Sequence, residues 1–287
     1  MTLSFIERGG NLSKVNTQPF VTLSEETRQA ALAKFGKCNI YIQIGNATQE
    51  LFANIDLLNI YPETRVPKDY PYVLGLVLIF QCNEGLGDLQ AAEATRVRTD
   101  WKYALHLPLN FPGLNPDVLC DFRQRLCLND LHKANFKRLL DRVQEYFCLK
   151  GQPPADDVDF VLQSVCSRSR LELAATTMQV AIQALTVTRY EWLSRIMRPH
   201  WYQRYSRSLA TLLIPDDLPS QVNLTESIGI DGFYLSEMVS QANDSEISKL
   251  HEIQILKRVW ETQFEQPAKD SCRHTGDCSN CGVKLIN

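Results

Sequence analysis

The fold is decided by the stretch YVLGLVLIFQCNEGLGDLQAAEATRVRTDWKYALHLPL, which runs from Tyr72 to Leu109. Its first part is almost wholly apolar as far as Cys82 and predicts a helix. A short turn with glycine, Glu84 to Asp88, leads into an alanine-rich helix for which Asp88 is a natural N-cap. Two helices joined in this way are typical of a helix-turn-helix unit, although any antiparallel helix pair gives the same pattern.

On both sides of this hairpin, the sequence also predicts mainly helix. Apolar residues recur with a period close to 3.6 residues through residues 119–147, and residues 170–187 carry a long apolar stripe. The short run 158–165, which follows glycine and proline punctuation, could form a strand. The expected fold is therefore mainly α: a helical bundle with a helix-turn-helix-like unit and at most one or two short strands near residues 157–165.

Positive charge gathers in the middle of the chain, although the net charge of the whole is only −3. Residues 96–142 carry nine Lys and Arg against five Asp and Glu. A local cationic block of this kind favours contact with nucleic-acid phosphates, whereas the plainer interpretation is a solvated helix face. The residues expected to contact DNA are first Arg96, Arg98 and Lys102, and then a second surface formed by Arg123, Arg125, Lys137 and Arg138.

Trp101 and Tyr103 alternate with the cations of the first surface. In a short helix tryptophan belongs more often to the core than to a binding face, because it buries a large apolar area. We therefore expect Trp101 to be an anchor that fixes the direction of the neighbouring cations.

Composition indicates a globular protein. The chain of 287 residues, 44% of them hydrophobic, is long enough for one large domain or two ordinary ones. No run of apolar residues is long enough for a membrane span and the amino terminus lacks a signal-peptide pattern, so a cytoplasmic protein without membrane contact is expected.

The nine cysteines, an odd number in this setting, argue against a disulfide framework. Near the carboxyl end, Cys272, His274, Cys278 and Cys281 could together supply the four ligands of a tetrahedral Zn²⁺ site. The cluster lacks a second ligand pair at zinc-finger spacing, so an unstructured tail is the favoured interpretation.

A longer run, EGLGDLQAAEATRVRTDWKYALHLPLNFPGLNPDVLCDFRQRL over residues 84–126, resembles the amino-terminal domain of bacterial insertion-sequence transposases of the DDE class, the InsH-like group. The likeness continues in the same order through RLELAATTMQVAIQAL and SIGIDGFYLSEMV to LKRVWETQFEQ, and it covers residues 19–266. It implies a helical DNA-binding region followed by an RNase H-like catalytic domain with three carboxylates and two divalent metals.

In that family the first carboxylate lies in the first strand of the catalytic fold, and Asp157 takes this place by its position in the resemblance. The family's neighbouring Ser-Thr pair is here Val158 and Asp159. After residue 266 only 21 residues remain, so the portion that supplies the second and third carboxylates is expected to be missing. Two-metal chemistry needs several carboxylates, and one aspartate cannot hold both ions.

Four parts are expected: a flexible tail over residues 1–19, a transposase-type DNA-binding domain over 20–150, a remnant of the catalytic domain with a helical insertion over 151–266, and a cysteine-rich tail over 267–287. The resemblance implies a nucleoid-associated bacterial protein that binds double-stranded DNA at inverted-repeat ends, without strand-transfer activity or cofactor of its own.

Two alternatives stay open. In one, a partner chain or a downstream frame completes an active transposase with Mg²⁺ or Mn²⁺. In the other, the chain is a helical remnant that only associates through exposed apolar surface.

Overall fold

The computed structural model describes residues 22–61, 70–148, 157–206, 214–215, 218–242 and 244–265. In these ranges the chain forms fourteen α-helices, one short 3-10 helix and no β-strand. The predicted mainly α fold is confirmed. No helix in the described ranges combines the length and the apolar character that a membrane crossing requires.

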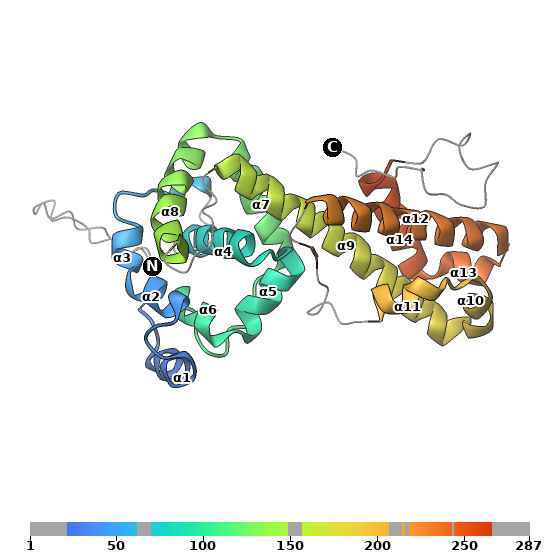
Figure 1. The fold of residues 1–287 in the computed structure, drawn as a ribbon, viewed down its shortest axis with the longest axis horizontal. Coiled ribbons are helices and arrows are strands. Elements are labelled where there is room, and N and C mark those ends of the chain that lie inside the picture. Colours follow the sequence, from blue (N-terminus) through green and yellow to red (C-terminus); the bar gives the residue numbers. More distant parts are fainter. Residues whose placement is uncertain are drawn as a thin grey trace, which may run out of the picture.

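The helices form two lobes that are joined by one long helix, α9 (Figure 1). The first lobe contains α1 (Glu25–Phe35), α2 (Ile40–Asn46), α3 (Thr48–Leu51), η1 (Leu58–Ile60), α4 (Tyr70–Glu84), α5 (Asp88–Val97), α6 (Thr99–Ala104), α7 (Pro116–Cys127) and α8 (Asp130–Cys148). The connecting helix α9 spans Val158–Thr188. The second lobe contains α10 (Tyr190–Ile196), α11 (Pro199–Tyr205), α12 (Leu218–Ala242), α13 (Ser245–Lys249) and α14 (His251–Gln263).

Helix α4 lies in the core of the first lobe, which suits its almost wholly apolar sequence. Every residue from Pro71 to Gln81 is buried. Trp101 is fully buried beside this helix, with its ring centroid 5.2 Å from that of Phe80. The prediction that Trp101 is a core anchor is confirmed.

The prediction that residues 158–165 could form a strand is wrong, because this run forms the first turns of α9. Val158, Val161, Leu162 and Val165 are all buried and recur at the spacing of one helix face. Asp157 caps the helix by accepting a hydrogen bond from the amide of Asp159 at 3.1 Å. Burial of this face against the first lobe overrides the weak strand preference of the valines.

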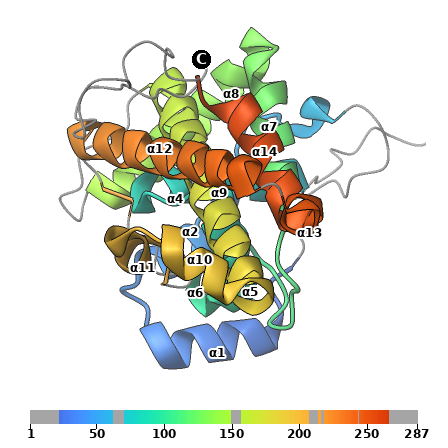
Figure 2. The ribbon, with the colours of Figure 1, turned by 90° about the vertical axis from the view of Figure 1, so that its right-hand side faces the viewer.

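The two lobes have separate hydrophobic cores, and α9 contributes to both. The core of the first lobe includes residues of α9 up to Val165, and the core of the second begins at Leu171. Figure 2 looks along the molecule from the second lobe, where α12 crosses above α10 and α11. The two cores therefore divide inside α9, between Val165 and Leu171.

Candidate nucleic-acid interface

Helices α4 and α5 form the predicted hairpin, with a sharp turn between them. Gly85 has a φ of +66°, a left-handed conformation that glycine adopts without strain. The amide of Leu86 donates to the carbonyl of Gln81 at 2.9 Å and closes the last turn of α4. The N-cap of α5 is Gly87 and not Asp88, which corrects the prediction. Asp88 is the first helical residue, and its carboxylate binds Arg123 of α7 instead of capping α5.

A carboxylate from α9 caps the start of α5. Glu172, fully buried, accepts hydrogen bonds from the amides of Leu89 at 2.9 Å and Gln90 at 2.8 Å. Burial raises the pKa of Glu172 to about 7, against the lowering effect of these two hydrogen bonds. The fit leaves no room for a side chain at Gly87, where a Cβ would lie 2.2 Å from an Oε atom of Glu172.

Two further residues of α9 hold the same turn. Ser169 Oγ accepts a hydrogen bond from the amide of Asp88 at 3.2 Å, and Arg168 donates one to the carbonyl of Gly85 at 3.0 Å. In helix-turn-helix proteins the amino-terminal residues of the second helix contact base edges. Here α9 covers that end, so the accessible part of α5 is its outer side and its carboxyl-terminal end.

Arg123 does not lie on a solvent-facing side, which corrects its assignment to the second DNA surface. Its guanidinium binds both carboxylate oxygens of Asp88 at 2.6 Å, and both side chains are buried. Gln81 adds a third bond to the same carboxylate at 2.9 Å. Because Arg123 lies four residues after Leu119 on α7, it shares the apolar face of that helix.

Lys102 is also buried, with only 5% of the residue exposed. Its ammonium group donates a hydrogen bond to the carbonyl of Leu109 and so closes the loop after α6. The whole segment from Asp100 to Ala104 is buried, and α6 therefore has no solvent-facing side on which a cation could meet DNA. The prediction that Lys102 contacts phosphate is wrong for this structure.

Arg98 and Arg96 differ from each other. Arg98 forms ion pairs with Glu84 and with Asp100, the latter at 2.7 Å, and its guanidinium lies 5.1 Å from the ring centroid of Trp101. This residue belongs mainly to the structure of the hairpin. Arg96 keeps 55% of its side chain exposed, and its one ion pair with a described residue is to Glu93, three residues earlier on α5.

The other three cations of the second surface reach solvent. Arg125 pairs with Asp121 at 2.8 Å, and Lys137 pairs with Asp141. Arg138 is exposed and lies 3.5 Å from the amide oxygen of Asn135. Pairs of this kind between neighbours on one helix contribute only a few tenths of a kcal/mol each, so a phosphate can displace those of Lys137 and Arg138 at little cost, whereas Arg125 also lies 4.7 Å from the ring centroid of Tyr61.

The residues considered for metal binding fall in different places. Asp157 is the N-cap of α9, at the start of a helix rather than in a strand. The described part of the chain contains no group of three or more His, Cys, Asp or Glu side chains arranged to hold a metal ion. Cys272, His274, Cys278 and Cys281 lie outside the described residues.

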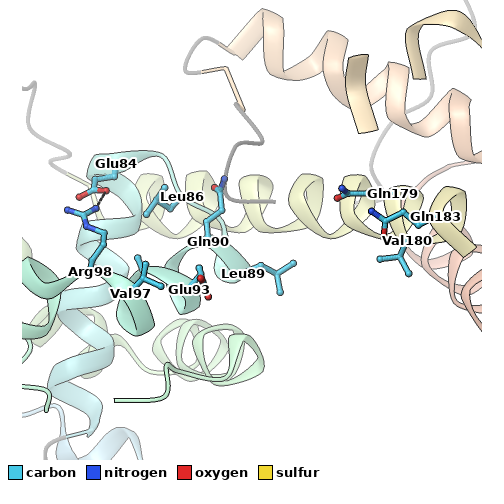
Figure 3. A pocket seen from close by; sticks show the side chains of 11 residues that line it. Glu84, Leu86, Leu89, Gln90, Glu93, Val97, Arg98, Gln179, Val180 and Gln183 are labelled. Atoms are coloured by element: carbon cyan, nitrogen blue, oxygen red, sulfur yellow. Dashed lines mark hydrogen bonds and ion pairs between the residues drawn. The ribbon is translucent and has the colours of Figure 1, made fainter. Parts of the chain in front are cut away.

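A groove of about 670 Å³ separates α5 from the second half of α9. Figure 3 shows Glu84 and Arg98 at one end, and Gln179, Val180 and Gln183 projecting from α9 at the other. Its walls are largely apolar, formed by Leu86, Leu89, Ala94, Val97 and Val180. The groove is therefore better suited to a hydrophobic partner than to a phosphate backbone.

The second lobe contains another cationic segment, which was not predicted. Residues 189–205, RYEWLSRIMRPHWYQRY, hold four arginines and one glutamate among five aromatic residues. Such alternation of arginine and aromatic residues is a signal of nucleic-acid binding that could have been found from the sequence. Arg198, His200 and Arg204 of this segment meet at the buried Asp231 of α12.

No family model, curated protein or solved structure matches this chain.

Proposed function

We propose that this chain is a transposase-related protein that binds double-stranded DNA, including inverted-repeat ends, and has no strand-transfer activity on its own. In this proposal the protein acts in a bacterial cytoplasm, on the nucleoid. The observation that carries it is the α4–α5 hairpin, whose turn is held by three residues of α9 while Arg96 stays exposed near the end of α5.

A rigid hairpin supports DNA binding because a helix held in place loses little conformational entropy when it meets the duplex. The remaining exposed cations, Arg125, Lys137 and Arg138, would add phosphate contacts with little loss of internal structure. Phosphate contacts of this kind bind any duplex and do not by themselves select a sequence.

The proposal includes no strand transfer by this chain because of the role of Asp157. One of its carboxylate oxygens accepts the amide of Asp159 and caps α9. A site completed by a partner chain, with Mg²⁺ or Mn²⁺, would have to use the other carboxylate oxygen or break this cap, which costs about 1 kcal/mol.

DNA binding is tested by fluorescence anisotropy of a labelled duplex as a function of salt. The wild-type protein is expected to bind with an affinity that falls steeply as salt rises, because bound cations release counterions from DNA. Arg96→Ala is expected to reduce the slope of log K against log salt by about 0.9.

The matched control is Arg28→Ala on α1. Arg28 pairs with Glu25 three residues earlier at 2.7 Å and keeps 48% of its side chain exposed, so the charge change and the local geometry are the same. Equal effects of the two variants, or no salt dependence for the wild type, would contradict the proposal.

A second candidate function is self-association through α9. Leu173, Val180 and Val187 recur every seven residues on this helix and are exposed, and Val180 faces the apolar groove (Figure 3). Helices of two chains pair through apolar residues at two positions of each seven-residue repeat, and these three residues supply one of the two. Sedimentation analysis would then show a dimer that Val180→Asp dissociates. A concentration-independent monomer would exclude this candidate.

A further inference from the structure

The buried carboxylate of Asp231 gathers an excess of basic groups in the second lobe. Asp231 has 1% of its side chain exposed. Oδ2 accepts hydrogen bonds from Arg204 and from the hydroxyl of Tyr205, the latter at 2.9 Å. Oδ1 lies 3.1 Å from His200 Nε2 and 3.9 Å from the guanidinium of Arg198. We call Arg198, His200, Arg204 and Asp231 the Asp231 cluster.

The cluster has more positive than negative charge. Both arginines are charged at every accessible pH, whereas Asp231 supplies a single negative charge. In the described part of the chain no other carboxylate lies within 4.0 Å of either guanidinium. At least one positive charge is therefore uncompensated, and His200 adds another when it is protonated.

Most of the hydrogen-bond donors in the cluster remain available. A guanidinium has five N–H donors. Arg204 uses Nη1 for Asp231, and the 3.9 Å separation of Arg198 from this carboxylate is longer than a hydrogen bond. The side chains of Arg198, His200 and Arg204 are 34%, 45% and 21% exposed, so Arg198 and His200 reach solvent readily and Arg204 less, while the negative charge stays buried.

The donors are also held in position. Arg198 stacks over the ring of Tyr234 at 3.8 Å, and the hydroxyl of Tyr234 donates to the carbonyl of Ile196 at 3.2 Å. A stacked guanidinium loses less side-chain entropy on binding an anion than a free one does. Two arginines fixed around one buried acid are suited to the planar, paired hydrogen bonds that phosphate oxygens accept.

We propose that the Asp231 cluster binds a phosphate group, and that the backbone of DNA supplies it. The DNA source rests on the function proposed above, whereas the phosphate site does not. Arg198 and Arg204 supply the hydrogen bonds to the phosphate, and Asp231 is the positioning residue that holds Arg204.

The test compares Arg198→Ala with Arg195→Ala. Arg195 lies exposed on the same segment and forms no ion pair with a described residue, so both variants remove one surface charge. Arg198→Ala should fold normally because its one ion pair is long, which thermal unfolding and circular dichroism check.

In the DNA arm, Arg198→Ala is expected to weaken binding of a short mixed-sequence duplex about tenfold and to lower the salt slope by about 0.9, as loss of one phosphate contact predicts. Arg195→Ala should leave the slope unchanged, and Arg198→Lys should restore it while recovering only part of the affinity.

In the second arm, inorganic phosphate should raise the melting temperature of the wild type and of Arg195→Ala, but not of Arg198→Ala, at matched ionic strength. Equal behaviour of Arg198→Ala and Arg195→Ala in both arms would overturn the proposal. Stabilisation by phosphate without DNA binding by any variant would keep the site but overturn DNA as its source and the proposed function. DNA binding that Arg96→Ala weakens and Arg198→Ala does not would keep the proposed function and overturn this inference.

Discussion

Replacement of Arg123 by methionine should destabilise the protein strongly, because it would leave the carboxylate of Asp88 buried without its counter-charge. Asp88 is 9% exposed, and only Gln81 at 2.9 Å would still donate to its side chain. Removing one member of a buried ion pair typically costs 3 to 5 kcal/mol. The start of α5 offsets part of this, since a helix amino terminus stabilises a nearby negative charge by up to about 1 kcal/mol. We therefore expect Arg123→Met to lower the free energy of unfolding by about 3 kcal/mol.

Urea denaturation followed by circular dichroism measures this loss. Arg125→Met is the matched control, two residues later on α7, where the guanidinium pairs with Asp121 and is 42% exposed. Its expected cost is below about 1 kcal/mol. The double variant Asp88→Asn with Arg123→Met should recover most of the loss, because it leaves no buried charge.

Equal losses in Arg123→Met and Arg125→Met would refute this reasoning. That outcome would mean that Arg123 is a surface cation after all, and it would return the residue to the DNA-contacting surface expected from the sequence.

Three further predictions concern the clamp of α9 on α5 and the buried lysine. Between pH 4.5 and about pH 7 the folded state should hold a proton on Glu172 that the unfolded state releases, so stability should fall by up to about 3 kcal/mol as the pH rises through this window. Glu172→Gln should remove that part of the pH dependence, as urea unfolding at several pH values would show, and an unchanged dependence would contradict the assignment. Gly87→Ala should cost about 1 to 3 kcal/mol because its Cβ would meet the carboxylate of Glu172, and an unaltered urea midpoint would show that the contact relaxes freely. Lys102→Met should lower the melting temperature but leave the salt slope of DNA binding unchanged, whereas a reduced slope with normal stability would place Lys102 at the interface.

The hairpin of α4 and α5 could be predicted because local features determine it. A run of apolar residues with helical length, a glycine that adopts positive φ and an alanine-rich continuation all act within a few residues of chain. The burial of Trp101 follows equally directly from its size and neighbours.

The secondary structure of the run from Val158 to Val165 was harder to predict, because valines favour a strand when no partner surface is known. The positions Val158, Val161, Leu162 and Val165 also fit one face of a helix. Only the core of the first lobe decides between the two, and that core is built from segments far away in the sequence.

The burial of Arg123 could be predicted in part from the sequence. Leu119, Phe122, Arg123 and Leu126 have the spacing of one helix face, so an arginine at this position needs a buried partner. Its partner is Asp88, on another helix, and the sequence alone does not reveal which acid comes near it. The cap that Glu172 provides for α5 could not be predicted for the same reason, since it depends on how α9 crosses the hairpin.

Charge counted along a segment is a poor guide to where a protein offers cations to a ligand, because the count ignores internal pairing. In the middle block, Arg123 pairs with Asp88, Arg98 pairs with both Glu84 and Asp100, and Lys102 donates a hydrogen bond to a backbone carbonyl. In residues 189–205 the positive excess is smaller in number, yet two arginines share one buried acid and keep donors in solvent. A phosphate is attracted by uncompensated positive charge at a fixed, accessible position. By that criterion, the Asp231 cluster in the second lobe is better preorganised to bind phosphate than most of the cations in residues 96–142.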